Sequence, residues 1–480
     1  MSGTTIALLG FAAMLGLIAI RMPIALAMLV VGAAGYAWLS GPHALIYYLR
    51  TNTYSQFASY TLSVIPLFIL MGALAERSGI ASTLFLAAER RLGRLKGGMP
   101  MAVIAACAGF GAICGSSVAT TATFGRAALP ELRRTRVNPG FGSGTIAAGG
   151  TLGIIIPPSV ILVVYAITAE QNIAKLFQAA LIPGLLAVAL YIIAIAIAVR
   201  RKPDLAPPVK VLDVPKTPQP AWARPLGAVL VAAAALAWYG GYLGNVGAVL
   251  AAILGVLLAI ADFAIIPAAV VAVLVVGGIY GAVFTPTEGA AVGAVVMFAV
   301  AALQRKIDLK GLKDAFLQTA ETTGMIFLIL LGAEVFGAFL ALTQMPMTLA
   351  SMVGGSGLPP YVVICAMLLA YIVLGAVMDE LAMILLTLPV FIPIVLGLDL
   401  GIPTDDIAIW FGILVLVVVG IGLTAPPIGL NVFIINKVAG NIPITQTYRG
   451  VMPFVIADFV RLAILTAFPS LSLFLVHLLN

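Results

Sequence analysis

Two apolar stretches of the sequence carry polar side chains that are able to bind ions. The first stretch, CGSSVATT, is rich in glycine and small hydroxyl residues: Gly115, Ser116, Ser117, Thr120 and Thr121. The second, VMDEL, carries the adjacent carboxylates Asp379 and Glu380. Hydroxyl, carbonyl and carboxylate oxygens are the ligands that hard cations prefer, and ionisable residues at membrane depth mark ion or substrate pathways. Both stretches are therefore candidate binding segments.

Two proline pairs interrupt apolar segments that would otherwise read as continuous helices. Pro157-Pro158 lies in GTLGIIIPPSVIL, and Pro426-Pro427 lies in GIGLTAPPIGLNVF. Proline lacks a donor N–H and clashes one turn back, so each pair leaves backbone groups unpaired. In lipid, such backbone is tolerated only where it is buried in protein or lines a cavity. The freed carbonyls suit cations, and the exposed helix N-termini suit carboxylates.

Each candidate residue also has a purely structural interpretation. The small residues of CGSSVATT allow close helix packing. Asp379 is either a ligand for a cation or proton, or the N-cap of the helix that follows it. Thr285, Pro286 and Glu288 in FTPTEG match a capping box, which predicts a structural role for Glu288.

Three further ionisable residues lie within apolar segments. Glu334 either faces a cavity or makes one interhelical hydrogen bond, and the sequence leaves both open. Asp458 and Arg461 are three residues apart on the last predicted helix, so we expect them to neutralise each other.

The composition is that of a membrane protein that crosses the bilayer many times. The 480 residues are 62% hydrophobic and 9% charged, with a mean hydropathy of +1.17. At ~20 residues per crossing, the apolar runs predict roughly ten to twelve spans. They lie near residues 4–20, 23–40, 61–76, 141–168, 178–199, 226–243, 245–263, 265–283, 286–304, 316–342, 407–436 and 451–478. Basic cytoplasmic loops explain the net charge of +7, so we expect no binding of nucleic acid.

The sequence carries no motif for hydrolysis or redox chemistry. It has no nucleotide-binding loop, no G-x-S-x-G and no H-E-x-x-H, and its three cysteines and two histidines lack metal-ligand spacing. We therefore expect no enzyme activity, no ATP, no cofactor beyond coupling ions, and an ion gradient or a partner as the energy source.

The basic loops predict how the chain crosses the membrane. If they are cytoplasmic, both termini lie outside. Basic loops flank residues 99–130 on both sides, so this segment must enter and leave on one side as a re-entrant hairpin. Residues 361–396 form a second such hairpin, which enters from the outside.

Landmarks at nearly constant separation indicate two repeats. Pro23 matches Pro286, Gly111 matches Gly375, and the first proline pair matches the second. The basic loops give the repeats opposite orientations, which is the pattern of secondary transporters with a midplane site. The predicted fold is all-α and polytopic. The first inverted repeat spans 1–199 with a broken helix at 141–168, and the second spans 264–480 with a broken helix at 407–436. Between them lie a cytoplasmic Pro-rich linker (200–225) and an extra helical pair (226–263).

Four motifs together resemble one transporter family. They are GSSVATTATFGRAALPELRR, AAGGTLGIIIPPSVILVVYA, GAVFTPTEGAAVGAVV and GIGLTAPPIGLNVFI. They are similar to the large membrane subunit of tripartite ATP-independent periplasmic (TRAP) transporters, over nearly all the chain except residues 226–263. The resemblance implies an ion-transporter-like fold with a scaffold and a mobile transport domain, an elevator mechanism, sodium coupling and organic acids, such as sialic acid or a dicarboxylate, as substrates. It also implies a small membrane subunit of four helices, expected here as a separate chain, and a periplasmic substrate-binding protein.

The resemblance also assigns site residues. It implies a first half-site at the first hairpin tip and first proline break. It implies a second half-site at Asp379 and Glu380 with Thr424, Pro426, Pro427 and Asn431. The sodium ligands would come from Gly115, Ser116, Ser117, Thr151, Asp379, Thr424 and Pro426. The substrate ligands would come from Thr120, Ser159, Glu380 and Asn431.

Three functions remain open at this stage. The leading prediction is import of a carboxylate by sodium symport from a binding protein. The second is a stand-alone Na⁺- or H⁺-coupled carboxylate carrier or antiporter. The third is a non-transporting membrane scaffold, against which the polar tips argue because polar groups at membrane depth are costly.

Overall fold

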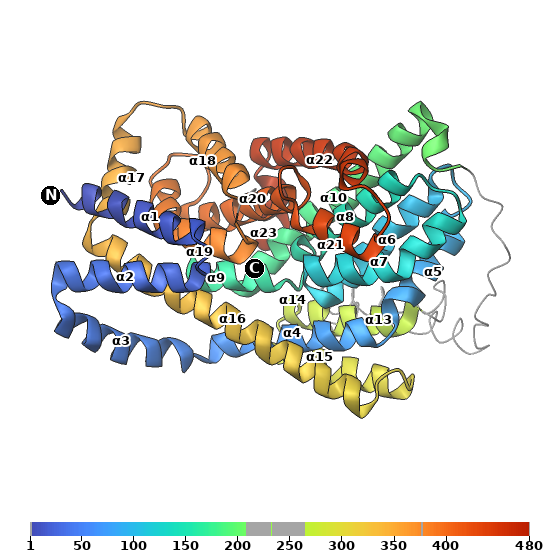
Figure 1. The fold of residues 1–480 in the computed structure, drawn as a ribbon, viewed down its shortest axis with the longest axis horizontal. Helices are drawn as coiled ribbons and strands as arrows, with labels where there is room; N and C mark the ends of the chain where they lie inside the picture. Colours follow the sequence, from blue (N-terminus) through green and yellow to red (C-terminus); the bar gives the residue numbers. More distant parts are fainter. Residues whose placement is uncertain (1, 208–231, 233–264, 376–377, 480) are drawn as a thin grey trace.

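A computed structural model describes residues 2–207, 232, 265–375 and 378–479 (Figure 1). These residues form helices and connecting loops without a strand, which confirms the all-α prediction. The extra helical pair (226–263) and most of the linker (200–225) lie outside the described residues, apart from residue 232 and the start of the linker.

The described residues of the first half form ten α-helices. They are α1 (Gly3–Ala19), α2 (Ile24–Ser40), α3 (Pro42–Phe57), α4 (Val64–Arg77, after the 3₁₀ turn Tyr60–Ser63), α5 (Ile80–Leu92), α6 (Gly98–Cys114), α7 (Ser117–Arg134), α8 (Pro139–Ile155), α9 (Val160–Thr168) and α10 (Ile173–Arg201). A short 3₁₀ turn, Pro203–Leu205, follows α10.

The described part of the second half starts with an interrupted helix and ends with two helices joined by a short link. Its elements are α13 (Ile266–Ala272), the π-turn η4 (Val273–Gly277), α14 (Gly278–Tyr280), α15 (Pro286–Leu303), α16 (Leu309–Leu342), α17 (Met345–Gly355), α18 (Pro360–Gly375), α19 (Glu380–Leu396), α20 (Thr404–Thr424), α21 (Leu430–Ala439), α22 (Ile444–Ala467) and α23 (Ser470–Leu479).

Two pairs of packed helices lie in the segments predicted as hairpins, residues 99–130 and 361–396. Helices α6 and α7 form the first, and α18 and α19 form the second. The first broken helix is α8 with α9, which are bent by 44° across the proline pair. The second is α20 with α21, separated by the segment that holds Pro426-Pro427. Both Pro-Pro peptide bonds are cis.

Three short helices and one helix break were not predicted from the sequence. Helices α3, α5 and α17 lie outside every predicted span and hairpin, because all three are short and because polar or charged side chains interrupt the apolar runs of α3 and α5. The last predicted span is divided into α22 and α23 at Pro469, since proline disfavours helix in the residue before it.

Fewer helices than predicted are long enough to cross a membrane. Among the described residues, six helices have the required length and hydropathy, or seven if the bent pair α8–α9 is one span. The count falls short of ten to twelve because α1 and α2 have only 17 residues each, the predicted span at 265–283 is a short interrupted helix, and residues 226–263 are not described.

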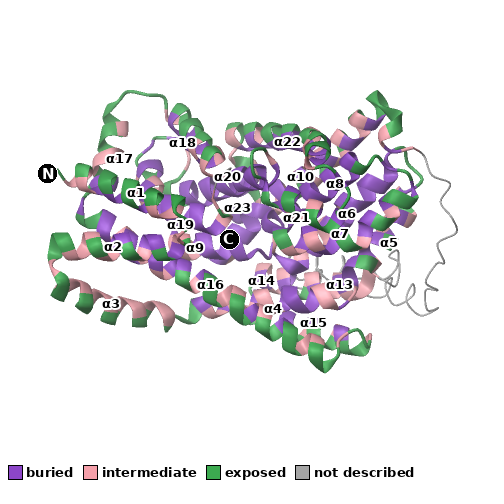
Figure 2. Cartoon of the chain, in the orientation of Figure 1, coloured by how far each residue is buried: buried purple, intermediate pink, exposed green. Residues whose placement is uncertain are grey.

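The helices are arranged in two layers (Figure 1). Helices α1–α4 pack with α15 and α16 in one layer, through contacts of α2 with α16 and of α4 with α15. The hairpins, the broken helices, α10 and α22 form the other layer. Buried residues concentrate along α8 and α20 in the middle of this layer (Figure 2), so the two broken helices form its core.

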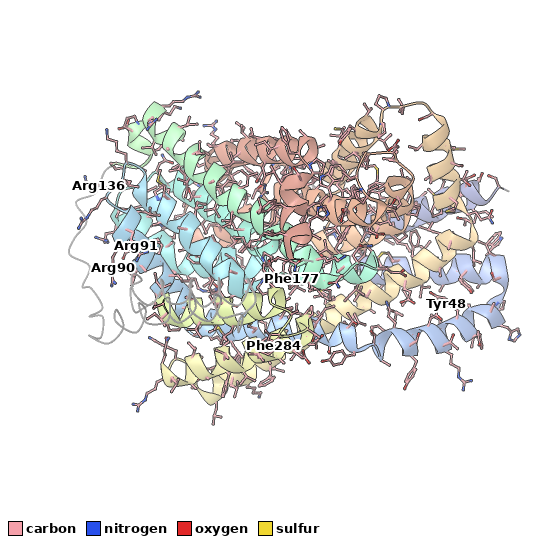
Figure 3. All side chains as sticks on the ribbon, turned by 180° about the vertical axis from the view of Figure 1, so that it is seen from behind. Tyr48, Arg90, Arg91, Arg136, Phe177 and Phe284 are labelled. Atoms are coloured by element: carbon pink, nitrogen blue, oxygen red, sulfur yellow. The ribbon has the colours of Figure 1, made fainter. Side chains whose placement is uncertain are left out.

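Basic side chains gather at one end of the molecule. Arg90, Arg91 and Arg136 lie together at this end in Figure 3, whereas Tyr48 lies towards the other end. We call it the arginine end.

Candidate functional site

The tip of the first hairpin is a tight turn between two helices. Gly115 ends α6 with a φ of +65°, a left-handed conformation that glycine adopts without a steric penalty. The Ser116 hydroxyl then caps α7 by accepting a hydrogen bond from the Ala119 N–H. The Thr120 hydroxyl donates to the Ser116 carbonyl at 2.7 Å. The predicted residues of this tip are therefore brought together, with the N-terminus of α7 at its centre.

This tip lies directly against the first proline break. A Cβ on Gly115 would stand 2.6 Å from the Pro158 carbonyl oxygen, so no other residue type fits at this point. Ser159 is fully buried and caps α9 by accepting from the Leu162 N–H. Two serine-capped helix N-termini, those of α7 and α9, thus meet at one place, where they can stabilise an anion.

A glycine–glycine contact holds each hairpin against its own broken helix. A Cβ on Gly111 of α6 would lie 3.0 Å from the Cα of Gly153 on α8. A Cβ on Gly422 of α20 would lie 3.2 Å from the Cα of Gly375 on α18. Gly153 and Gly422 both stand four residues before their proline pair. The two hairpin tips are therefore positioned by the same device.

The second tip presents two carboxylates. Asp379 caps α19 by accepting from the Leu381 N–H at 3.2 Å, and its side chain is exposed. Glu380 is half-buried, and its Oε2 is enclosed without a hydrogen-bond partner among the described residues. The capping interpretation of Asp379 is confirmed by this hydrogen bond.

The second proline break is more open than the first. Pro426 and Pro427 are exposed, whereas residues 151–160 around the first break are all buried. The Thr424 hydroxyl is buried and donates within α20 to the Gly420 and Ile421 carbonyls. The Tyr448 hydroxyl of α22 reaches the break and donates to the Pro427 carbonyl at 3.0 Å.

Asn431 is not where the sequence analysis grouped it. It was expected with Asp379 and Thr424 in the second half-site, but it contacts the first hairpin instead. Its amide donates to the Ser117 hydroxyl at 2.7 Å and to the Ala147 carbonyl at 3.1 Å, and its Oδ1 accepts from Ser117. The reason is that α21 packs across α7 and α8, so the helix after the second break supports the first tip.

Thr151 also points away from the tip. Its hydroxyl donates to the Ala148 carbonyl and lies 3.1 Å from the Tyr191 hydroxyl on α10. Tyr191 donates to Asp458, which forms an ion pair with Arg461 at 2.8 Å. The predicted neutralisation of Asp458 by Arg461 is confirmed, and Thr151 belongs to this buried network between α8, α10 and α22.

The two other glutamates of interest lie away from the tips. The capping box of Thr285 and Glu288 is present at the start of α15, as predicted. Glu334 of α16 faces Tyr48 and Gln56 of α3, and its Oε2 is enclosed without a hydrogen-bond partner among the described residues. Glu334 therefore lies beside the short helix α3, in the layer of α1–α4 with α15 and α16, and away from the hairpin tips.

Four residues of the site escaped the sequence analysis: Gly153, Gly422, Tyr191 and Tyr448. A signal existed for the two glycines, because both precede a proline pair by the same offset. The tyrosines carried no local signal, because their roles depend on helices distant in sequence. Within the described part of the chain, no three His, Cys, Asp or Glu side chains lie together as a metal site.

The comparison with protein families decides the relationship. The family described as "Tripartite ATP-independent periplasmic transporter, DctM component" matches residues 11–471. The chain belongs to this family. It is therefore the large membrane subunit of a TRAP transporter, a multi-pass membrane protein and one component of a substrate transport system, as the four motifs indicated.

Curated TRAP relatives carry different substrate names. The chain is 34% identical to the C4-dicarboxylate TRAP transporter large permease protein DctM of Pseudomonas aeruginosa, over 86% of each chain. It is 27% identical to the sialic acid large permease protein SiaM of Vibrio cholerae, over 88% of this chain and 87% of SiaM. It is 26% identical to the ectoine large permease protein TeaC of Halomonas elongata, over 97% of each chain.

Two solved transporters share the fold at low sequence identity. The YdaH transporter of Alcanivorax borkumensis has a TM-score of 0.58 and 16% identity, over 93% of this TRAP subunit and 96% of YdaH. MtrF of Neisseria gonorrhoeae has a TM-score of 0.56 and 12% identity, over 98% and 95% of the two chains. Both likenesses concern the arrangement of helices alone.

Proposed function

We propose that this TRAP subunit imports a carboxylate-type organic solute by sodium symport through an elevator movement. The observation that carries the proposal is the convergence of two serine-capped helix N-termini at the first hairpin tip. A solute carboxylate finds N–H groups and a positive helix end there, while nearby carbonyl and hydroxyl oxygens suit Na⁺. The second tip adds carboxylates that balance a bound cation.

The geometry narrows the proposed ligand set. Backbone carbonyls at Gly115, Ser116 and Ser117 remain the proposed sodium ligands of the first tip, with Thr120 and Ser159 towards the substrate. At the second tip we propose Asp379 with the Thr424 and Pro426 backbone for sodium, and Glu380 for the substrate side. We propose that Thr151 and Asn431 hold the neighbouring helices in place and do not bind a ligand, since their side chains are hydrogen-bonded to Tyr191 and Ser117, respectively.

The repeated order of elements supports two inverted repeats. In each half, a hairpin, a helix broken at Pro-Pro and a long helix follow one another. The pairing is crossed, because α9 packs on α19 of the second hairpin and α21 packs on α7 of the first. We infer that the layer of hairpins and broken helices is the mobile transport domain, and that the layer of α1–α4 with α15 and α16 is the scaffold.

The proposed partners follow from the family. We infer a small membrane subunit beside the scaffold and a periplasmic protein that delivers the solute, with both termini of this chain on the periplasmic face of the inner membrane. Among the named relatives, the C4-dicarboxylate protein has 34% identity. Sialic acid and ectoine also carry a carboxyl group, which is consistent with a carboxylate as the shared recognition element.

The test is uptake of labelled organic acids into proteoliposomes that hold this chain with its small subunit. A C4-dicarboxylate, sialic acid and ectoine are offered with and without the binding protein, under an imposed Na⁺ gradient. The proposal expects uptake that needs both the binding protein and Na⁺. Uptake without the binding protein assigns a stand-alone carrier, and uptake driven by a proton gradient alone overturns the sodium sites.

A further inference from the structure

A cavity of about 900 Å³ lies between α10 and α22, apart from the hairpin tips. Its walls are apolar side chains at helical spacing, which face outward from the transport layer. On α10 they are Leu190, Ile193, Ala194 and Ile197, and on α22 they are Pro453, Ile456 and Val460. Ile193 is 50% exposed and Ile456 is 59% exposed, so the wall opens sideways to the surroundings.

One end of the cavity is cationic. Arg201 and Lys202 close it on the α10 side, and Arg449 closes it on the α22 side, all three being exposed. Within the described residues, no carboxylate stands at ion-pair distance from any of these three groups. Their positive charges therefore face the cavity mouth without a neutralising partner from the described chain.

The cationic mouth lies at the arginine end of the molecule. The Asn138 N–H donates to the Leu205 carbonyl at 2.9 Å, which ties the start of α8 to the end of α10. Arg136, two residues before Asn138, is at the arginine end in Figure 3. The cavity thus runs from a basic mouth at this end along an apolar wall towards the middle of the layer.

We propose that this cavity binds an anionic phospholipid, with the phosphate at Arg201, Lys202 and Arg449 and an acyl chain along the apolar wall. Basic pockets between transmembrane helices bind anionic head groups, and guanidinium groups form paired hydrogen bonds with phosphate. A free anion would leave the apolar wall unfilled, and an uncharged apolar occupant would leave three cations unmatched. The charge and the shape together select a lipid.

The inference is independent of which solute the subunit transports. Because both walls belong to the proposed transport domain, the lipid would travel with that domain. Its binding is measurable on the purified protein without any transport assay.

The experiment is native mass spectrometry of the full chain in a neutral detergent, titrated with phosphatidylglycerol, with phosphatidylcholine of the same acyl chains, or with glycerol 3-phosphate. The double variant Arg201→Gln/Arg449→Gln removes two mouth charges. The matched control Arg94→Gln/Arg200→Gln removes two exposed arginines that do not line the cavity. We expect the first variant to bind phosphatidylglycerol roughly 30-fold more weakly, because each arginine contributes about 1 kcal/mol to binding an anionic lipid and two arginines are removed. The control should bind as the parent does.

A second variant tests the apolar wall. Ala194→Trp fills the cavity beside α10 and should reduce phosphatidylglycerol binding while all mouth charges remain. Equal binding of phosphatidylglycerol and phosphatidylcholine overturns the proposal, as does an unchanged affinity in Arg201→Gln/Arg449→Gln. Competition by glycerol 3-phosphate at the same concentration as the lipid assigns a simple anion site and also overturns it.

Discussion

At the scale of single residues, Asp379 combines a cap with a charge, and substitution can separate the two. Asparagine and aspartate are about equally good N-caps, so Asp379→Asn keeps the hydrogen bond to Leu381 and removes the charge. Hydrogen bonds and contacts to charged groups contribute about 1.5–3 kcal/mol, so we expect the Na⁺ concentration for half-maximal uptake to rise about tenfold or more. Uptake measured against Na⁺ concentration gives the answer.

Asp379→Ala is the control for the cap itself. It should lower the thermal stability of the protein through loss of about 1 kcal/mol of capping, an effect absent from Asp379→Asn. If Asp379→Asn transports with unchanged Na⁺ dependence, Asp379 is a cap only and the sodium role at the second tip is wrong.

Asn431 links the second half of the chain to the first hairpin. Asn431→Ala leaves the buried Ser117 hydroxyl and the Ala147 carbonyl without this partner. An unsatisfied buried polar group costs about 1–3 kcal/mol, so we expect a lower melting temperature and reduced uptake. The exposed Asn441→Ala, just beyond the same helix, should change neither. If Asn441→Ala lowers the melting temperature as much as Asn431→Ala does, the lost hydrogen bond to Ser117 is not the cause of the destabilisation.

The residue chemistry of the tips was predictable, but its partners were not. Ser116, Ser117 and Thr120 were recognised because hydroxyls inside an apolar hairpin are unusual. That Asn431 joins Ser117, and that Thr151 joins Tyr191, depends on how α21 and α10 cross α8. No periodicity within one segment encodes such a crossing.

At the scale of elements, close packing of glycines determines where the hairpins sit. A Cβ at position 153 would meet the Ser116 carbonyl at 2.7 Å and the Thr120 hydroxyl at 2.8 Å. We therefore expect Gly153→Ala to push the tip off α8, destabilise the protein by about 1–3 kcal/mol and greatly reduce uptake. Thermal unfolding and proteoliposome uptake measure the two effects.

Gly109→Ala on α6 is the matched control. Its added Cβ would meet only Leu84 at 3.6 Å, an ordinary contact, and alanine favours helix by about 0.5–1 kcal/mol. Gly109→Ala should thus be neutral or stabilising. If Gly153→Ala behaves in the same way, the glycine contact does not position the tip.

Helices were predicted well where they were long or interrupted by proline, and poorly where they were short. The spans predicted at 23–40, 178–199 and 286–304 agree with α2, α10 and α15 to within five residues, because twenty apolar residues leave few alternatives in a membrane. Helices α3 and α5 have a mixed composition that also fits a loop. Their positions are determined by packing on α2 and α6, which a single sequence does not display.

At the scale of the whole molecule, an ion pair connects the two layers. Arg126 of α7 pairs with Glu76 of α4 at 2.7 Å, and Gln318 of α16 donates to the same carboxylate. Helix α7 belongs to the proposed transport domain, whereas α4 and α16 belong to the proposed scaffold. If the layers slide during transport, this contact must break in each cycle, so a covalent link in its place should stop transport.

The link is made between cysteines in Glu76→Cys/Arg126→Cys, with the exposed Cys365 replaced by serine and a cleavable bifunctional thiol reagent added. We expect uptake to fall at least about tenfold on linking and to return on cleavage. Helix α5 packs on both arms of the first hairpin, so a link between α5 and α7 stays beside the hairpin. Glu89→Cys/Arg134→Cys makes this link in place of an ion pair of 3.6 Å and should leave uptake unchanged. Both links join α7 to a neighbouring helix. Loss of uptake in Glu76→Cys/Arg126→Cys alone therefore shows that the two layers move relative to each other. If uptake persists in both linked variants, the layers move together and the elevator proposal is wrong.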